Sequence, residues 1–250
     1  MFWFKRQSLP GLTGGRPASA PLQRVEPLFE LWCAFCGVLI FAAYMLMVKG
    51  VWQALFNADP TYLTALIVLL FLGATVWTGF RAMELTRQYQ HFEHLQHLLR
   101  TNTEQARAWL ASERHCWAQH FFAGLAQRGD GWRDSGQALN LLAERAASPH
   151  EMPWWLNGVL LKLGLLGKVI GFSILALQLG AMDTFDAGQT ATVLKTLTGG
   201  LGIALLTTMT GLAANMLLGL QLMRLDRFAD ALTAKALDIA EFDFHRVMGH

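Results

Sequence analysis

Four long apolar runs alternate with polar segments along the chain, at residues 31–48, 62–80, 154–181 and 197–223. The shortest run has 18 residues, which is about the minimum for a helix that crosses a bilayer. The pattern therefore predicts an all-α polytopic membrane protein with four transmembrane helices surrounded by membrane lipid.

The polar segments divide the chain into five regions. Turn residues between the first two runs, Asn57, Asp59 and Pro60, make those runs a hairpin. Helical periodicity is visible at 83–99 and again at 104–125. The predicted regions are a tail at 1–30, a transmembrane hairpin at 31–80, a polar helical domain at 81–153, two transmembrane helices at 154–223 and an amphipathic helix at 224–250.

Basic residues are unevenly distributed among these regions. Of the 20 Lys and Arg residues, 16 lie in the tail, the polar domain and the C-terminal helix, whereas the two short links carry one each, Lys49 and Lys195. Because Lys and Arg accumulate on the cytoplasmic side of membranes, we expect both termini and the 81–153 domain to be cytoplasmic.

Composition agrees with a membrane protein and excludes several other classes. The chain is 53% hydrophobic and 15% charged, with positive mean hydropathy, whereas a soluble domain is about one quarter charged. A net charge of +2, with no basic run that contains aromatic residues, argues against nucleic-acid binding. No phosphate loop, nucleophile elbow or paired metal motif indicates an enzyme.

Two groups of residues invite a chemical interpretation that we do not favour. Cys33 and Cys36 form a CxxC, but it lies within an apolar run, where two small side chains on a buried helix are expected rather than a redox pair. His91, His94 and His97 follow one another at three-residue steps, which spread them around a helix. We interpret these histidines as surface polarity, with a zinc site as the alternative.

Small and polar residues recur at helical spacing in the last two runs. Polar groups at membrane depth are costly unless they face a bundle interior or an aqueous path. We therefore expect these two helices to line a contact with another protein segment or a path for water. The predicted faces are Gly164, Lys168 and Gly171 in the third run, and Ala204, Thr208, Gly211 and Asn215 in the fourth. Glycines that allow close helix packing, whatever the function, are Gly164, Gly167, Gly171, Gly200, Gly202, Gly211 and Gly219.

These segments resemble a known family. GLLGKVIGF at 164–172 and LTGGLGIALLTTMTGLAA at 197–214 are similar to the signature region of the MotA/TolQ/ExbB proton-channel superfamily. Its third-span motif is close to GLxGTVxGxxxxF, and its fourth-span motif is close to LAxGIxxALxxTAxGLxxAIP. The first 150 residues resemble the family only in layout, which is nearer to the flagellar MotA branch, whereas the pore motif is nearer to TolQ and ExbB.

The resemblance implies a homopentamer in the bacterial cytoplasmic (inner) membrane, whose 154–223 helices line a pore around the single spans of two copies of an ExbD-, TolR- or MotB-like partner. Ions, which we expect to be protons, move the pentamer against that partner, and no cofactor takes part. The ion-binding carboxylate belongs to the partner in such systems. The assignment of this carboxylate to the partner agrees with the sequence of this chain, because 153–182 and 196–223 contain no Asp or Glu.

The roles of individual residues in the family can be assigned to this chain only where the motifs match. Thr208 occupies the position of the family's ion-path threonine, with Thr207 beside it, and Asn215 extends the same face. The alternative for Thr208 is a structural hydroxyl bonded to the carbonyl four residues back. Lys168 departs from the third-span motif, which has threonine there, and Ile203 stands where several members have glutamate.

Lys168 is the most informative of these departures. It lies 14 residues after Trp154, about 21 Å along a helix in a hydrocarbon core about 30 Å thick. A lysine at that depth costs roughly 3 kcal/mol, so we expect Lys168 to face the pore and pair with the partner's carboxylate; the alternative is that it snorkels to the interface, as Lys162 can.

Two hypotheses for the function follow. The first is an ion-conducting stator subunit that converts the ion-motive force into mechanical work. The second is a non-conducting membrane scaffold of the same architecture, which recruits a cytoplasmic protein through 81–153; the lysine in place of threonine at position 168 keeps it open.

Overall fold

The computed structural model describes residues 28–58, 61–112, 116–127, 135–180 and 190–244. Within these ranges every regular element is a helix, as the hydrophobic pattern predicts. The predicted tail before residue 28 and most of the link between the last two runs lie outside them, as do Asp59 and Pro60 of the predicted turn. Asn57, the third residue of that turn, lies instead in a short helix, Val51–Ala58. The elements are α1 (Leu28–Val48), α2 (Val51–Ala58), α3 (Leu63–Thr101), α4 (Thr103–Ala111), α5 (Trp117–Gln127), α6 (Ser135–Ala147), a 3₁₀ turn (Ser148–His150), α7 (Glu151–Gly180), α8 (Thr190–Asp238) and a π-helical turn (Ile239–Phe244).

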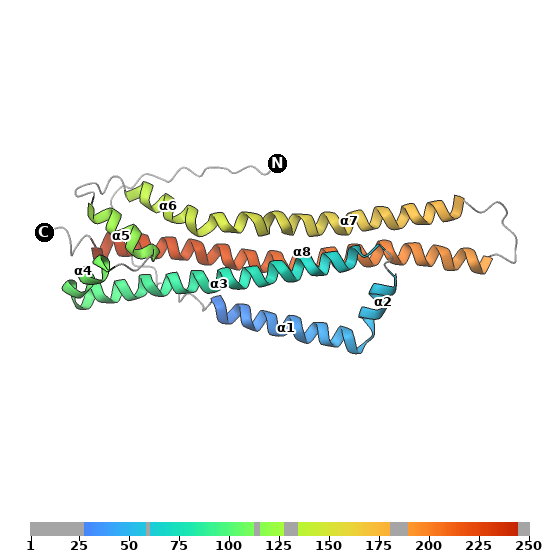
Figure 1. Cartoon of the computed structure of the whole chain (residues 1–250), viewed down its shortest axis with the longest axis horizontal. Coiled ribbons are helices and arrows are strands. Elements are labelled where there is room, and N and C mark those ends of the chain that lie inside the picture. The colour runs from blue at the N-terminus through green and yellow to red at the C-terminus, as the bar shows by residue number, and fades with distance from the viewer. Residues whose placement is uncertain (1–27, 59–60, 113–115, 128–134, 181–189, 245–250) are drawn as a thin grey trace, which may run out of the picture.

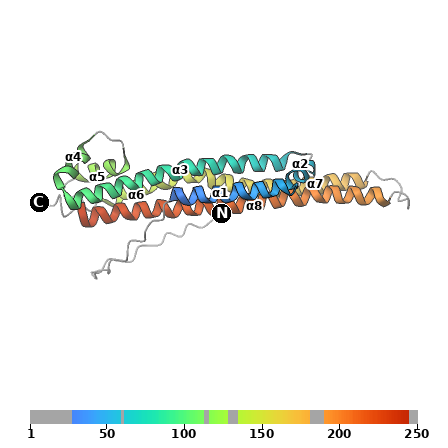
Figure 2. The ribbon, with the colours of Figure 1, turned by 90° about the horizontal axis from the view of Figure 1, so that it is seen from below.

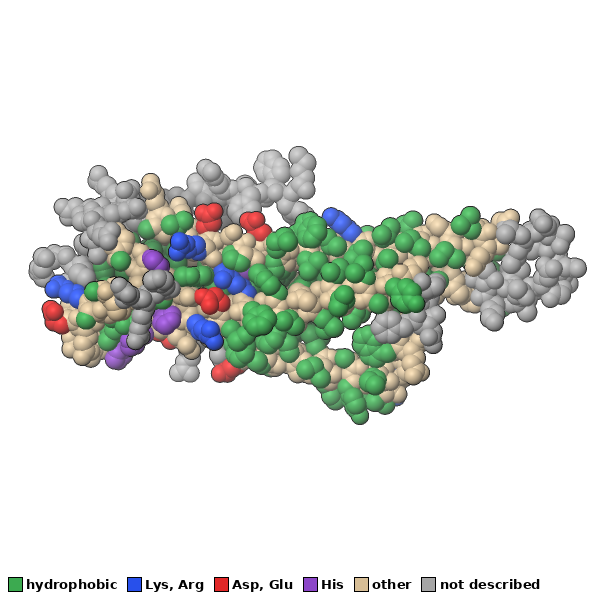
Figure 3. Space-filling view, in the orientation of Figure 1, with side chains coloured by type: hydrophobic (Ala, Val, Ile, Leu, Met, Phe, Trp, Pro, Cys, Tyr) green, Lys and Arg blue, Asp and Glu red, His purple; other side chains and the backbone are tan. Residues whose placement is uncertain are grey.

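Four of the described helices are long and apolar enough to cross a membrane. They coincide with the four predicted runs, except that Tyr62 precedes α3 and residue 181 lies outside the described ranges. In Figures 1 and 2, α3, α7 and α8 run side by side, whereas α1 leans away from them toward α2. Apolar side chains cover the visible face of these helices, and most charged and His side chains gather at the end that holds α4, α5 and α6 (Figure 3). This distribution is that of a multi-pass membrane protein with a polar domain on one side.

Two helices are much longer than a membrane span. α3 has 39 residues and α8 has 49, about 58 and 73 Å at 1.5 Å per residue, against a hydrocarbon core of about 30 Å. The helices therefore continue unbroken through the region boundaries that were predicted after residues 80 and 223. Polarity changes at these two points, but no proline follows there to interrupt the backbone hydrogen bonds.

The polar domain differs in one respect from its predicted helices. The helix expected at 104–125 is divided, because Ser112 is extended, with ψ of 144°. Gln119 stabilises the break: its side-chain amide donates to the carbonyls of Trp109 and Ser112 at 2.8 and 3.1 Å. The break turns α5 back so that its aromatic residues can reach α3.

One hydrophobic core joins the polar domain to the end of α8. It includes Leu85 of α3, Phe122 of α5 and Leu232 of α8, all fully buried. At its base the Arg81 guanidinium donates to the carbonyl of Arg145 at 3.0 Å, at the end of α6. The amphipathic C-terminal helix therefore packs as part of the polar domain.

Candidate functional site at the contact of α7 and α8

Glycines bring the backbones of α7 and α8 into direct contact. A Cβ added to Gly211 would lie 2.7 Å from the Gly164 Cα, and one added to Gly164 would lie 3.1 Å from the Gly211 Cα. Backbone atoms cannot move aside as a flexible side chain can. Close packing at this point therefore requires glycine on both helices.

Three of the other five glycines assigned to helix packing make similar approaches. An added Cβ would meet Thr207 at Gly167, Ala204 at Gly171 and Leu175 at Gly200, at nearest distances of 2.5, 2.8 and 2.9 Å. Gly202 was expected to pack closely as well, but nothing lies within 4 Å of a Cβ at that position. It points away from α7, so spacing along the sequence alone did not separate packed glycines from exposed ones.

The predicted threonines lie in this contact with their hydroxyls directed toward their own helix. Thr207 is fully buried, and its hydroxyl donates to the Ile203 carbonyl at 2.8 Å. The Thr208 hydroxyl donates to the Ala204 carbonyl at 2.7 Å and lies 3.2 Å from the Gly164 carbonyl of α7. A hydroxyl has one hydrogen, and the shorter of the two contacts is the own-helix bond described above; a role of Thr208 in passing an ion stays a prediction.

Two asparagines, Asn215 of α8 and Asn157 of α7, extend the polar contact further along the helices. The Asn215 side chain donates to the backbone carbonyl of Asn157 on α7 at 2.8 Å. Asn157 is itself buried, and its side-chain oxygen has no hydrogen-bond partner among the described residues. Sequence analysis did not select Asn157, although an amide inside an apolar run is a signal that could have found it.

Lys168 does not lie in the stripe that it was expected to share with Gly164 and Gly171. Those glycines are buried on α7, together with Gly167, whereas Lys168 is exposed. Four residues advance a helix by about 400°, so Lys168 stands about 40° from Gly164, on the side opposite Gly167. Within the described ranges it has no hydrogen-bond or ion-pair partner, and Lys162 is likewise exposed.

A polar cluster that the sequence analysis missed lies just beyond the apolar part of this contact. His150 is 2% exposed, and its Nδ1 lies 2.7 Å from Asp226 Oδ1. Trp154 Nε1 donates to the other carboxylate oxygen at 2.9 Å. An ionised carboxylate only accepts hydrogen bonds, so His150 Nδ1–H is the donor.

Two carboxyl groups at this cluster have opposite pKa shifts. Burial raises the pKa of Asp226, but the hydrogen bonds from His150 and Trp154 outweigh it and hold that pKa below its ordinary value. Burial, and then the negative charge of Asp226, raise the pKa of Asp230 one turn further along α8. The cluster therefore stabilises one negative charge and disfavours a second.

We expect opposite effects from Asp226→Asn and Asp230→Asn. The lowered pKa of Asp226 contributes stability that is present above the ordinary value of about 3.9 and is lost as pH falls through the folded-state pKa. Asp226→Asn should lower the thermal midpoint at pH 7 by about 3 °C, given about 1 kcal/mol for partly exposed charged hydrogen bonds. Asp230→Asn should raise it, because the raised pKa of Asp230 makes its ionised form unfavourable.

Thermal unfolding in detergent at pH 7, 5 and 3.5 checks this prediction. The gain of Asp230→Asn should shrink toward zero as pH falls through the raised folded-state pKa of Asp230 toward the ordinary value of about 3.9. The deficit of Asp226→Asn should begin to shrink only below that value, as pH falls toward the lowered folded-state pKa of Asp226. A deficit of Asp226→Asn that stays constant over this range would mean that its charge does not stabilise the cluster.

The remaining candidates lie elsewhere. Cys33 and Cys36 are free thiols on α1, and Cys33 is exposed, so the expectation that both are buried was wrong: α1 leans away from the bundle. His94 lies edge-on to the Trp109 ring, with centroids 6.0 Å apart. Among the residues that the structure describes, no three His, Cys, Asp or Glu side chains form a group that could hold a metal ion.

No family model, curated protein or solved structure matches this chain. The resemblance to the proton-channel superfamily therefore rests on residues 164–172 and 197–214, which include the glycines where α7 and α8 approach most closely.

Proposed function

We propose that this chain is the ion-conducting, energy-transducing subunit of a membrane motor. It forms a homopentamer around two copies of a single-span partner similar to ExbD, TolR or MotB, in the bacterial cytoplasmic membrane, with both termini in the cytoplasm. Protons move down their gradient between the pentamer and the partner, and this movement drives mechanical work.

One observation carries the proposal. Hydroxyl and amide groups of Thr207, Thr208 and Asn215 follow the α7–α8 contact, while residues 153–182 and 196–223 contain no carboxylate. Hydroxyls and amides can pass a proton along hydrogen bonds, but they do not hold one as a titrating group near neutral pH. In the proposed motor, the group that binds and releases the ion belongs to the partner.

Lys168 supports the same assignment. It is an exposed cation in an apolar helix and has no partner within the described part of the chain. A cation at this depth is costly unless it is paired or reaches water, and a carboxylate on the partner's span would pair with it. Five such lysines around one lumen would repel sodium ions, which favours protons as the transported ion.

The intact mass of the complex tests the proposal. The protein is extracted from its native membrane in a mild detergent, and whatever copurifies is weighed by native mass spectrometry. The expected mass is that of five copies of this 27.8 kDa chain and two copies of a small single-span protein with an acidic residue in its span. A monomer, a dimer or a complex with soluble proteins alone would contradict it.

The scaffold hypothesis stays as a second candidate because of a surface on the polar domain. A hollow of about 480 Å³ between α5 and α6 is lined by Trp117, Phe121 and Leu141, with Arg145 beside them. Leu141 is 56% exposed there, as expected for a protein-binding surface. Copurification of a soluble protein that is lost on Leu141→Asp, without any single-span partner, would favour this second function.

A further inference from the structure

The hollow between α5 and α6 has a charge that its own chain does not neutralise. Its lining combines apolar and aromatic side chains with Arg145, and no Asp or Glu is among the residues that line it. Arg145 is exposed, and its side chain has no hydrogen-bond or ion-pair partner in the described part of the chain. A second cation, Arg81, stands 5.3 Å from the centre of the ring of Trp117, which lines the hollow. The α5–α6 hollow is therefore apolar and electropositive.

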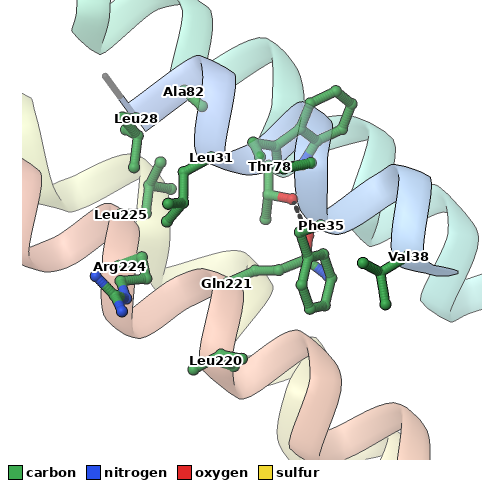
Figure 4. Close-up of a pocket in the computed structure, with 12 residues that line it drawn as sticks. Leu28, Leu31, Phe35, Val38, Thr78, Ala82, Leu220, Gln221, Arg224 and Leu225 are labelled. Carbon is green, nitrogen blue, oxygen red and sulfur yellow. Dashed lines mark hydrogen bonds between the residues drawn. The ribbon is translucent and has the colours of Figure 1, made fainter. Parts of the chain in front are cut away.

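The groove between α1, α3 and α8 offers no comparable site. Figure 4 shows that Thr78 and Gln221 face each other across it, and the Thr78 hydroxyl donates to the Gln221 side-chain oxygen at 2.8 Å. The Gln221 amide in turn donates to Thr75 at 3.2 Å. Arg224, which also lines the groove, already takes part in an interaction. These polar groups need no further partner, in contrast to Arg145.

A surface that complements the α5–α6 hollow lies at the end of α8. This C-terminal knob consists of the exposed side chains of Leu237, Glu241 and Phe242. Phe242 is 57% exposed, and Glu241 has no hydrogen-bond or ion-pair partner among the described residues. The next two residues anchor the turn, because Asp243 pairs with Arg100 of α3 at 3.0 Å and Phe244 is buried in the core. An exposed aromatic ring on an anchored turn is typical of a protein-binding surface.

The occupant that suits the hollow is another copy of the chain. Residues 1–27 carry four basic residues and one acidic residue, so an electropositive hollow would repel them. The knob of the same chain points elsewhere: Leu237 lies about 140° around α8 from Leu232, which faces the core shared with α5 and α6. In Figures 1 and 2, α5, α6 and the end of α8 lie at the same end of the molecule. Copies related by rotation about the membrane normal therefore bring one knob level with the next hollow.

We propose that the C-terminal knob of one copy docks in the α5–α6 hollow of the next copy. Phe242 enters between Trp117 and Leu141, and Glu241 pairs with Arg145. A contact between two different surfaces is heterologous, and it closes into a ring when the rotation between copies allows it. This inference rests on the homo-oligomer of the proposed function, and it names the surfaces that join the copies in the polar domain.

Disulfide cross-linking in native membranes tests the docking. The variant with both Leu141→Cys and Phe242→Cys should form, on mild oxidation, a covalent ladder that extends beyond the dimer, because each copy is linked to the next. Each single variant controls for the native thiols. Leu141→Cys combined with Ala111→Cys, at an exposed position of α4 outside the knob, should form no ladder. A ladder that is absent, or that stops at the dimer as an isologous contact would, would overturn the proposal.

An exchange of charges tests the predicted ion pair. In the double-cysteine background, Arg145→Glu should lower the cross-linked fraction about three-fold, as expected for a partly exposed ion pair. Adding Glu241→Arg should restore it. Arg87→Glu is the matched control, because Arg87 is exposed on α3 and does not line the hollow, and it should leave cross-linking unchanged. Failure of the exchange to restore cross-linking would exclude the pair.

Native mass spectrometry of the parent protein separates this inference from the motor proposal. Five copies by mass, without cross-linking between knob and hollow, would overturn the docking and leave the motor proposal standing. A monomeric parent would contradict both. Cross-linking of Leu141→Cys to a soluble protein, or within its own chain, would show a different occupant of the hollow and would also overturn the docking.

Discussion

Gly211→Ala is expected to destabilise the protein by about 3 kcal/mol, which corresponds to about 10 °C in the thermal midpoint. The added methyl group would lie 2.7 Å from the Gly164 Cα and 3.0 Å from the Leu160 carbonyl oxygen. Both are backbone atoms, so the overlap is relieved only by moving α7 away from α8. That movement would also break the Asn215–Asn157 hydrogen bond, 2.8 Å long in the parent.

Gly202→Ala is the matched control, on the same helix and with the same chemical change. Nothing lies within 4 Å of a Cβ at Gly202, and alanine favours a helix over glycine by about 1 kcal/mol. Its midpoint should therefore stay unchanged or rise by a few degrees. Thermal unfolding of both variants in the same detergent tests the predicted difference between their midpoints. Equal midpoints would mean that the close approach at Gly211 does not hold the two helices together.

Lys168→Ala is expected to keep the complex assembled and to reduce proton flux at least about ten-fold. This prediction rests on the proposed function, in which the ammonium group of Lys168 pairs with the partner's carboxylate and sets when it binds a proton. Lys168 is exposed and makes no contact that packs α7 on α8, so its removal should not change folding. Flux is measured with a pH-sensitive dye inside vesicles that hold the complex with its copurified partner.

Lys162→Ala provides the control for charge on the same helix. Lys162 is also an exposed lysine of α7, about 1.7 turns nearer the polar domain, where its side chain can reach the interface. Its variant should conduct as the parent does. Normal flux in Lys168→Ala, with the complex intact by mass, would exclude the pairing, whereas failure of the parent chain to assemble with any partner would contradict the motor proposal itself.

The helical spacing of small and polar residues predicted the α8 side of the candidate site more accurately than the α7 side. On α8 the predicted face of Ala204, Thr208, Gly211 and Asn215 does lie against α7. On α7 the same reasoning misplaced Lys168, because residues four apart differ by about 40° around a helix, enough to move a side chain from the centre of a narrow contact to its flank. The true centre includes Gly167, which the three-residue pattern left out.

The sequence by itself determined the helical class and the four spans, because apolar runs of this length with so few charges satisfy their backbone in lipid as helices. Tertiary structure alone decided which polar groups meet. Asn157 and Asn215 are 58 residues apart, and His150 and Asp226 are 76 apart. No local pattern specifies such pairs: they follow from how α7 and α8 align when glycine lets their backbones touch. The same packing leaves Lys168 exposed at the flank of the α7–α8 contact.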